Sequence, residues 1–292
     1  RMRRLFPLPP AGTPRPSLPE GTGPLLVIGL VGGEAHGPHA WSNRLTESPA
    51  FRVPGSASSP ACELCMHHDQ HHGVLYLSLS SSMASQALLE QADVLARATS
   101  KQAIHAWLVE KSTEHMRALL LLFHLSHAVL VLSDARCVDV GLLRQLRTLH
   151  TLKQAVQPTV QVALKPVLHP ASRGGGQRND QRNDQRNEAQ LPTLPALGFV
   201  FASPPVPSPD APGADGSLSA RLRLEAALEA QVRALLGSSK LLMRCGGGGH
   251  SGGGGASQLY SLHRDGCVHV QPHAQPPLSL AGCRDAAEPG YF

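Results

Sequence analysis

The sequence predicts an α/β fold in which helices flank a largely parallel sheet. Short apolar runs with the length of buried strands occur at residues 25–30, 74–79, 128–132 and 197–202. The segments between them carry apolar residues at three- and four-residue intervals, the spacing that lines one face of an α-helix. Strand and helix patterns that alternate in this way are typical of a parallel sheet.

The helices of the first half are predicted from this spacing. After a short helix near 40–45, two longer helices are expected at 84–98 and 102–124. The apolar residues that mark the longer two are Leu88, Leu89, Ala92, Leu95, Ala96, Ile104, Leu108 and Met116.

In the second half, Cys137-Val138-Asp139 precedes a helix marked by apolar residues from Val140 to Leu149. A further amphipathic helix is expected at 219–236. The step Asp265-Gly266 favours the positive φ of a tight turn. It predicts a hairpin between residues 259–262 and 267–270.

One domain is expected at 24–271, interrupted by segments that cannot contribute to a core. A repeat without apolar residues buries too little surface to offset its chain entropy, and Pro-rich or Gly-rich stretches behave similarly. We therefore expect a disordered N-terminus at 1–23, an irregular tail at 272–292, and low-complexity inserts at about 49–73, 157–195, 203–217 and 245–257.

The first apolar run leads into a Gly-rich turn, where a nucleotide-binding protein would carry its phosphate loop. The loop pattern G-x-x-x-x-G-K-[ST] supplies backbone N–H groups and a Lys to the phosphates, and a hydroxyl to Mg²⁺. Counted from Gly29, the last three of these positions hold Glu34, Ala35 and His36. This register therefore offers no cation and adds a carboxylate.

A second register begins at Gly32. It recovers the second glycine at Gly37, but Pro38 and His39 replace the Lys and the hydroxyl. Neither register can hold phosphates, so we expect no bound nucleotide cofactor. The degenerate loop comprises Gly29, Gly32, Gly33, Glu34, Ala35 and His36.

Two further sequence motifs of a GTPase are also missing. A D-x-x-G turn should follow the second strand, where the chain has Ser80-Ser81-Ser82-Met83. An N-K-x-D station should follow the strand at 197–202, where it has Ser203-Pro204-Pro205-Val206. The three losses predict a P-loop GTPase-like sheet without nucleotide chemistry, a pseudo-GTPase. The alternatives are a divergent GTPase and an unrelated α/β protein.

A cluster of cysteines and histidines lies before the second strand. Cys62-x-x-Cys65 is followed by His67, His68, His71 and His72. Thiolates and imidazoles at this spacing suit tetrahedral Zn²⁺, which gives a candidate metal set of Cys62, Cys65, His67 and His71. A zinc-stabilised binding domain is thus another alternative, and a solvated His-rich loop is the simpler interpretation.

Two other patterns point to catalysis only weakly. Gly249-His250-Ser251-Gly252-Gly253 matches the G-x-S-x-G nucleophile motif, but glycines flank it where the motif needs a strand and a helix. His124 and His127 are expected to be structural, because they lie where a helix meets a strand. We expect no catalytic residues.

Composition limits the classes of partner. The net charge of +5 is scattered, and aromatic residues make up only 4%, so direct nucleic-acid binding is not expected. Six cysteines in 292 residues lack the density of a secreted disulfide scaffold. The apolar stretch 118–132 is too short to cross a bilayer. These features predict a cytoplasmic protein, with a nuclear pool allowed.

Several segments resemble a known family. They are Leu25 to Gly32, Leu119 to Leu132, Cys137-Val138-Asp139, Leu197 to Ala202 and Arg221 to Leu241. Together they are similar to the N-terminal G-domain-like region of the eighth Smg factor family of nonsense-mediated mRNA decay. The resemblance covers about 24–48, 74–155 and 196–271.

This resemblance implies a regulatory subunit rather than an enzyme. Members pair through this region with the G-domain protein called the ninth Smg factor. The pair binds and restrains the phosphatidylinositol-3-kinase-related kinase that phosphorylates the decay helicase. Nucleotide binding in the pair is ascribed to the partner.

Overall fold

A computed structural model of the chain describes its secondary-structure elements and their immediate surroundings. The described residues are 3–6, 25–32, 43, 51, 62–81, 88–89, 91–97, 100–133, 137–168, 195–202, 214–239, 260–262 and 266–271.

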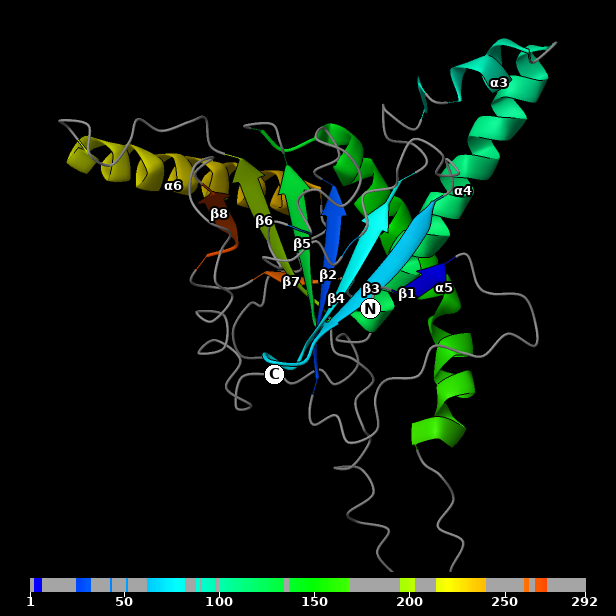
Figure 1. The fold of residues 1–292 in the computed structure, drawn as a ribbon, viewed down its shortest axis with the longest axis horizontal. Coiled ribbons are helices and arrows are strands. Elements are labelled where there is room, and N and C mark those ends of the chain that lie inside the picture. Colours follow the sequence, from blue (N-terminus) through cyan, green and yellow to red (C-terminus); the bar gives the residue numbers. More distant parts are fainter. Residues whose placement is uncertain are drawn as a thin grey trace, which may run out of the picture.

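An eight-stranded sheet forms the centre of the molecule (Figure 1). Its strand order is β1-β3-β4-β2-β5-β6-β7, and β8 pairs with β6 beyond β7. β3 runs antiparallel to β1 and β4, whereas the other pairs are parallel. The strands are β1 (Arg3–Phe6), β2 (Leu26–Gly32), β3 (Glu63–Asp69), β4 (Val74–Ser80), β5 (Ala128–Ser133), β6 (Ala196–Ala202), β7 (Ser261–Leu262) and β8 (Val268–Gln271).

Within the described part of the chain, four helices accompany the sheet. They are α3 (Ala92–Ala96), α4 (Lys101–Leu125), α5 (Val140–Leu168) and α6 (Ala214–Ser238). α4 begins after Ser100, whose hydroxyl accepts the backbone N–H of Ala103 at 3.1 Å, an N-cap contact. None of the described helices is long and apolar enough to span a bilayer.

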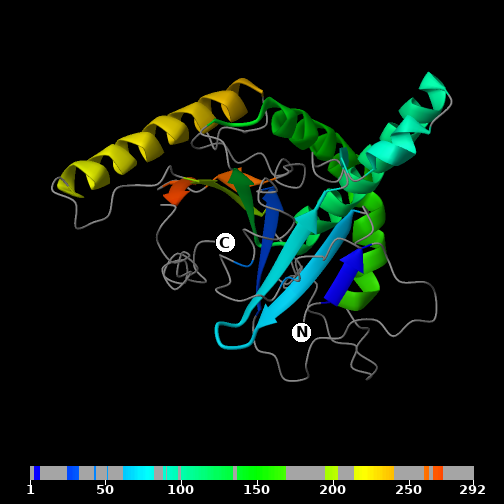
Figure 2. The ribbon, with the colours of Figure 1, turned by 45° about the horizontal axis from the view of Figure 1, so that its top comes forward.

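The main hydrophobic core lies between one face of the sheet and the three long helices, which Figure 2 shows on the same side of the sheet. α4 contributes a stripe from Ala118 to Phe123, α5 contributes Leu142, Leu146 and Leu149, and α6 contributes its buried leucines and Val232. These spacings of three and four residues place each set on one helix face. The expected α/β sheet flanked by helices is therefore confirmed.

A second, smaller core lies on the opposite face of the sheet. It comprises Ile28, Leu30, Phe51, Cys65, Val74, Tyr76, Leu132 and Val200. Residues that alternate along a strand point to opposite faces, so the central strands are apolar on both sides. This explains why the strand sequences are continuous apolar runs.

Two expected non-core segments contain strands. Within 1–23, β1 pairs with β3 from Arg3↔Met66 to Phe6↔Leu64. It ends before Pro7, so all of its residues keep a backbone N–H. Within 49–73, β3 occupies Glu63–Asp69 in place of an insert. Its apolar run is only three residues long, from Leu64 to Met66, and histidines follow it, so the pattern did not indicate a strand.

Helix boundaries also differ from expectation. α5 continues to Leu168, into the segment 157–195 that we expected to be an insert. The helix passes through Pro158, a residue that normally interrupts a helix, so the expected boundary was too early. α6 begins at Ala214, inside the expected insert 203–217. The expected insert 245–257 and tail 272–292 lie outside the described residues.

The hairpin predicted at the C-terminal end is wrong. Both β7 and β8 pair in parallel with β6, from Ala196↔Ser261 to Ala202↔Gln271. Gly266 does have a positive φ of 149°, but the chain there connects two parts of one sheet edge. The Asp-Gly step therefore predicted the wrong partner strand, and Asp265 itself lies outside the described residues.

Candidate functional site

The candidate site lies at the carboxyl ends of the parallel strands. β2 is at the centre of the sheet, with β4 on one side and β5 on the other. The chain leaves β2 toward β3 and β4 and later returns to β5, so the direction of winding reverses beside β2. Open α/β sheets bind ligands in the crevice that such a reversal creates.

Gly32 ends β2 at this crevice. Its φ is +90°, and a side chain there would collide with the carbonyl oxygen of Leu132 on β5. Only glycine adopts this conformation without cost. The strand continues to Gly32, so a phosphate loop could begin there but not at Gly29, which pairs with Val129 inside the sheet.

Gly29 has a packing role instead. A methyl group at this position would lie 2.5 Å from Cδ2 of Leu122 and 2.7 Å from Oγ of Ser126. Both residues belong to the C-terminal end of α4. The glycine therefore lets the helix approach the central strand closely.

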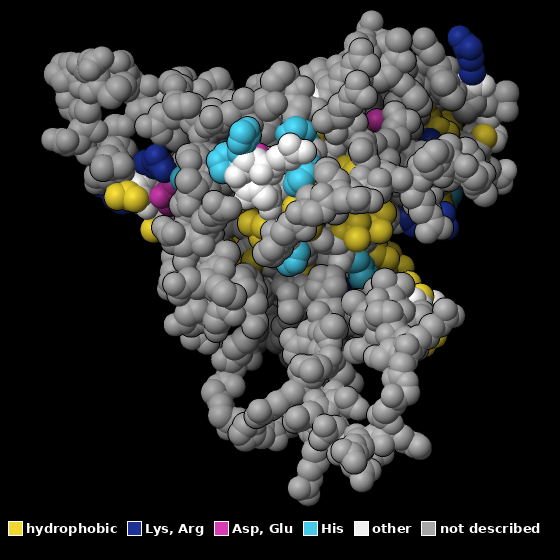
Figure 3. Space-filling model, turned by 60° about the horizontal axis from the view of Figure 1, so that its bottom comes forward, with side chains coloured by type: hydrophobic (Ala, Val, Ile, Leu, Met, Phe, Trp, Pro, Cys, Tyr) yellow, Lys and Arg dark blue, Asp and Glu magenta, His cyan; other side chains and the backbone are white. Residues whose placement is uncertain are grey.

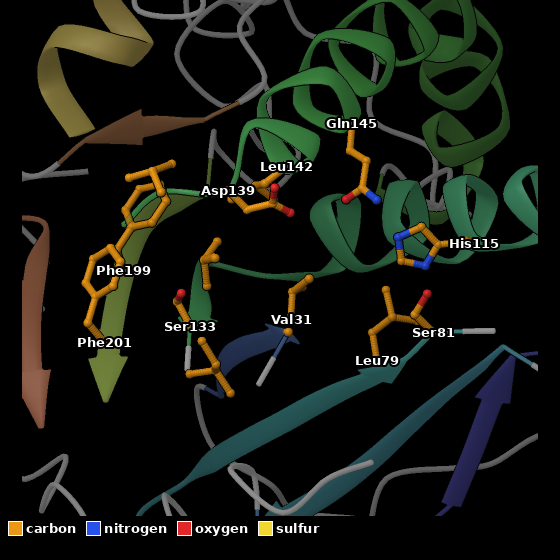
Figure 4. A pocket seen from close by; sticks show the side chains of 14 residues that line it. Val31, Leu79, Ser81, His115, Ser133, Asp139, Leu142, Gln145, Phe199 and Phe201 are labelled. Atoms are coloured by element: carbon orange, nitrogen blue, oxygen red, sulfur yellow. The ribbon is translucent and has the colours of Figure 1, made fainter. Parts of the chain in front are cut away.

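A cavity of about 230 Å³ occupies the crevice (Figure 4). Its walls come from the ends of β2, β4, β5 and β6 and from α4 and α5. Apolar side chains dominate, and Ser81, His115, Ser133, Asp139 and Gln145 supply the polar groups. The apolar residues are Val31, Leu79, Val131, Leu132, Val138, Leu142, Phe199 and Phe201.

The charge of this cavity does not suit phosphates. Among the described lining residues there is no Lys or Arg, and Asp139 is the charged group at the rim. One Asp139 oxygen accepts the backbone N–H of Gly141 at 2.8 Å, so this residue caps the N-terminus of α5. Ser81 follows β4 where a GTPase would carry its Mg²⁺-linked Asp. These residues do not fit a Mg²⁺-nucleotide.

The buried His115 and the half-buried Gln145 form a polar pair in the wall of the cavity. Only 5% of His115 is exposed. Burial lowers its pKa, and a hydrogen bond with the Gln145 side chain opposes this shift. The second ring nitrogen, Nδ1, has no partner among the described residues. Sequence reasoning missed both residues, because each falls at an ordinary position of an amphipathic helix.

The cysteine and histidine cluster is not brought together by β3. Cys62 packs into the core beneath α4, whereas Cys65 packs into the core on the opposite face. Both thiols are buried, with 2% and 1% exposed. A single Zn²⁺ cannot contact both faces, and within the described part of the chain no three His, Cys, Asp or Glu side chains form a metal site.

The other two candidate ligands also lie apart. His67 is on β3, where its ring meets the ring of Phe51 edge-on with centroids 5.9 Å apart. Burial is the largest of the causes that lower its pKa. His71 lies in the exposed β3–β4 turn. The alternative prediction, a solvated His-rich loop, is also wrong at His67, because this residue lies within β3.

Asp69 organises the β3–β4 turn. Its carboxylate accepts the backbone N–H groups of His71 and His72 at 3.0 and 3.2 Å, and its second oxygen contacts Nδ1 of His72 at 2.6 Å. Gly73 completes the turn with a φ of 63°. Histidine side chains come to the surface over the face shown in Figure 3. In this turn, the bonds from His71 and His72 to Asp69 stabilise the β3–β4 hairpin.

His124 and His127 have structural roles. His127 Nδ1 accepts the backbone N–H of Val27 at 3.0 Å, and the His127 N–H donates to the Val27 carbonyl at 2.8 Å. His124 Nδ1 donates to the Leu120 carbonyl at 2.8 Å. Burial lowers the pKa of both rings. His127 therefore joins the segment between α4 and β5 to β2, and the bond of His124 lies within α4, as expected of structural histidines.

Two glutamates of α6 hold the edge of the sheet. Glu229 accepts the N–H groups of Cys267 and Val268 at 2.9 and 3.0 Å, and Glu225 accepts that of Val270 at 2.8 Å. Burial raises the pKa of Glu229, but the bonds from Cys267 and Arg233 outweigh it and hold the pKa below its ordinary value. These contacts were not predicted, because they depend on how α6 packs.

Other predicted site residues lie outside the described part of the chain. They are Gly33, Glu34, Ala35, His36, Gly37, Pro38, His39, the turn Ser203-Pro204-Pro205-Val206 and the segment Gly249-His250-Ser251-Gly252-Gly253.

Comparison with known proteins gives two matches. The family model Smg8_Smg9 matches residues 20–248. A curated protein of Xenopus tropicalis, "Nonsense-mediated mRNA decay factor SMG8", is 25% identical over 148 residues. That alignment covers 48% of this chain and 16% of the frog protein, so the chain spans a small part of its relative's length.

Proposed function

Since the chain belongs to the Smg8_Smg9 family, we propose that it is a non-catalytic regulatory subunit in nonsense-mediated mRNA decay. It pairs with the ninth Smg factor through a G-domain-like fold. The pair binds and restrains the phosphatidylinositol-3-kinase-related kinase of the pathway. The observation that carries this proposal is a cavity at the strand ends, beside α4 and α5, whose described walls are mainly apolar and hold no Lys or Arg.

The strand order supports the G-domain-like part of the proposal. If β2 is counted as the first strand, the strands from β3 to β8 lie in the order 2-3-1-4-5-6, β7 and β8 counting as one edge. The second strand is antiparallel and the phosphate-loop strand is central. This is the arrangement expected of a P-loop G domain, in which the first strand lies at the switch point.

The site chemistry supports the non-catalytic part. Phosphoryl transfer depends on cations that bind the β- and γ-phosphates and on a held Mg²⁺. The described walls of the cavity offer apolar side chains, neutral polar groups and one carboxylate at the rim. A protein of this kind acts by binding other proteins. We place it in the cytoplasm, with a nuclear pool.

Co-purification with the G domain of the ninth Smg factor tests the pairing. The 292-residue chain and this partner are mixed, separated by size-exclusion chromatography, and the nucleotide in each peak is measured. We expect a stable complex whose nucleotide is lost when the partner's phosphate loop is mutated. Failure to form a complex, or nucleotide that stays with this chain after that mutation, would contradict the proposal.

Restraint of the kinase is tested separately. Phosphorylation of the decay helicase by the kinase is measured with the partner alone and with the partner plus this chain. We expect a lower rate when both are present. An unchanged rate, with the complex intact by chromatography, would reject kinase restraint by this part of the protein and leave the pairing standing.

A further inference from the structure

We propose, on the basis of the G-domain-like fold of the proposed function, that Asn43 and Phe51 form a latch. The latch holds the connection between β2 and β3 against the sheet in one conformation, whatever the nucleotide state of the pair. This adds a fixed conformation to the proposed role, which requires only that nucleotide chemistry is lost. Three features of the molecule support the latch: the place of the two residues in the chain, two hydrogen bonds between them and the burial of Phe51.

Both residues lie where a GTPase would carry a switch segment. β2 ends at Gly32 and β3 begins at Glu63, so Asn43 and Phe51 belong to the connection that follows the degenerate phosphate loop. In a GTPase, the γ-phosphate and its Mg²⁺ order the switch segments, and hydrolysis releases them. The contacts that hold Phe51 come instead from side chains of its own chain.

The side-chain amide of Asn43 bonds both backbone groups of Phe51. Nδ2 of Asn43 donates to the Phe51 carbonyl oxygen at 2.6 Å, and Oδ1 accepts the Phe51 N–H at 2.7 Å. Two residues of an antiparallel sheet exchange the same pair of bonds through their backbones. The Phe51 backbone therefore has a donor and an acceptor within the chain, which is what a buried backbone requires.

The Phe51 ring anchors the latch in the smaller core. The residue is fully buried, with 0% of its surface exposed, and it packs with side chains from β2 to β6 on that face of the sheet. Its ring also meets the ring of His67 edge-on, with centroids 5.9 Å apart. Exposing an aromatic side chain to water is unfavourable, so Phe51 leaves the sheet only if this core opens.

Together these contacts oppose switching. A switch segment needs two conformations that are close in free energy, because a ligand shifts their balance only by its difference in affinity for the two. A buried aromatic ring and two hydrogen bonds to its backbone favour one conformation over any other in which Phe51 is exposed. A partner therefore meets the same connection whether the pair holds a nucleoside diphosphate or triphosphate.

Amide hydrogen exchange at Phe51 measures the latch directly, because the Phe51 N–H is one of the bonded groups. The rate is measured by NMR on the 292-residue chain alone. It is then measured in the complex with the ninth Smg factor G domain, loaded with GDP or with a non-hydrolysable GTP analogue. We expect slow exchange at Phe51 in the chain alone and equal rates in the two loaded complexes.

Variants of Asn43 identify the bonding group. Asn43→Ala removes both bonds and should speed exchange at Phe51 about tenfold or more, since one buried hydrogen bond is worth about that factor. Asn43→Asp keeps an oxygen for the Phe51 N–H but loses the donor to the carbonyl, so its rate should be intermediate. Gln154→Ala removes a side-chain amide at an exposed position of α5 and should leave Phe51 unchanged. Slow exchange at Val129, inside the sheet, shows that each variant is folded.

Failure of the latch and failure of the proposed function give different results. Fast exchange at Phe51 in the wild type, equal rates in wild type and Asn43→Ala, or a rate that differs between the two loaded complexes would overturn the latch. None of these results would affect the pairing itself. If no complex forms, the pairing is rejected, and the variants of the chain alone still decide whether Asn43 holds Phe51.

Discussion

Two glycines on β2 are required for different physical reasons. Gly29 has no side chain because α4 packs directly against it, at Leu122 and Ser126. Gly32 has no side chain because its φ is +90° and Leu132 lies against it. Both were read from the sequence as parts of a phosphate loop. Only the geometry separates a packing glycine from a strand-end glycine.

Substitution of Gly29 by Ala tests the packing role. We expect a loss of about 1–3 kcal/mol in the free energy of unfolding, because a methyl group would lie 2.5 Å from Leu122 Cδ2. The measurement is chemical denaturation. Gly237→Ala in α6 is the control. No atom lies within 4 Å of a methyl group placed at Gly237, so this change should stabilise the protein by about 0.5–1 kcal/mol. Equal effects of the two changes would refute the close approach.

His127 should make stability depend on pH. Burial lowers its pKa from the ordinary 6.5, so the unfolded chain takes up the proton more readily than the folded chain. The contribution of neutral His127 is therefore complete above about pH 6.5 and decreases as the pH falls through the folded pKa. Protonation of Nδ1 also removes the acceptor for the Val27 N–H.

His127→Asn and His127→Leu check this in unfolding experiments at pH 7.5 and 5.5. Asn keeps an acceptor near the Nδ1 position and does not titrate, so the loss of stability between the two pH values should be smaller than in the wild type. Leu leaves the Val27 N–H without its side-chain partner, which costs about 1–3 kcal/mol at either pH. A pH dependence identical in all three proteins would reject the role of His127.

At the scale of elements, α6 supports an edge strand through side chains rather than through backbone pairing. Glu225 and Glu229 are one helical turn apart and accept N–H groups from β8 and the residue before it. Unpaired N–H groups on an edge strand invite association with other chains. The two carboxylates therefore stabilise this edge and shield it.

Glu229→Ala should loosen this edge. The change leaves the Cys267 and Val268 N–H groups without their acceptor. We expect a loss of roughly 2–4 kcal/mol and faster amide hydrogen exchange in β8. Arg233→Ala removes the partly exposed ion pair to Glu229 and leaves the carboxylate in place, so it should cost about 0–1 kcal/mol. Exchange in β8 as slow as in the wild type would show that Glu229 does not hold the edge.

The same carboxylate affects a thiol. Burial raises the pKa of Cys267 to about 12, and the nearby Glu229 charge adds to this effect. The sulfur lies 3.5 Å from Glu229 Oε1. Cys267 is therefore inert as a nucleophile at neutral pH, since the thiolate is the reactive form. It contributes to packing.

At the scale of the whole molecule, the sequence predicted the architecture better than the details. The four central strands are long apolar runs buried on both faces, and such runs leave little ambiguity. β3 was missed because its short apolar run, Leu64 to Met66, is followed directly by histidines that suggested a metal site. The path of the sheet edge at β7 and β8 was missed because strand partners depend on contacts distant in sequence.

The sequence predicted where the candidate site lies but not which side chains line it. The motif positions after β2 and β4 lie directly after predicted strands, so the sequence alone indicated the edge of the sheet where Gly32 and Ser81 line the cavity. His115, Gln145 and the Phe199–Phe201 pair could not be found in this way, since their meeting depends on how α4, α5 and β6 pack. The sequence predicted a loss of phosphate chemistry at this edge, but it did not predict the largely apolar cavity.

Direct nucleotide titration tests the central claim, that this edge of the sheet no longer binds phosphates. Mg²⁺-GTP and Mg²⁺-GDP are titrated calorimetrically into the 292-residue chain alone, with the ninth Smg factor G domain as the positive control. We expect saturable binding to the control and none to this chain. Stoichiometric binding to this chain that disappears in Gly32→Val would contradict the loss of phosphate binding and favour a divergent GTPase.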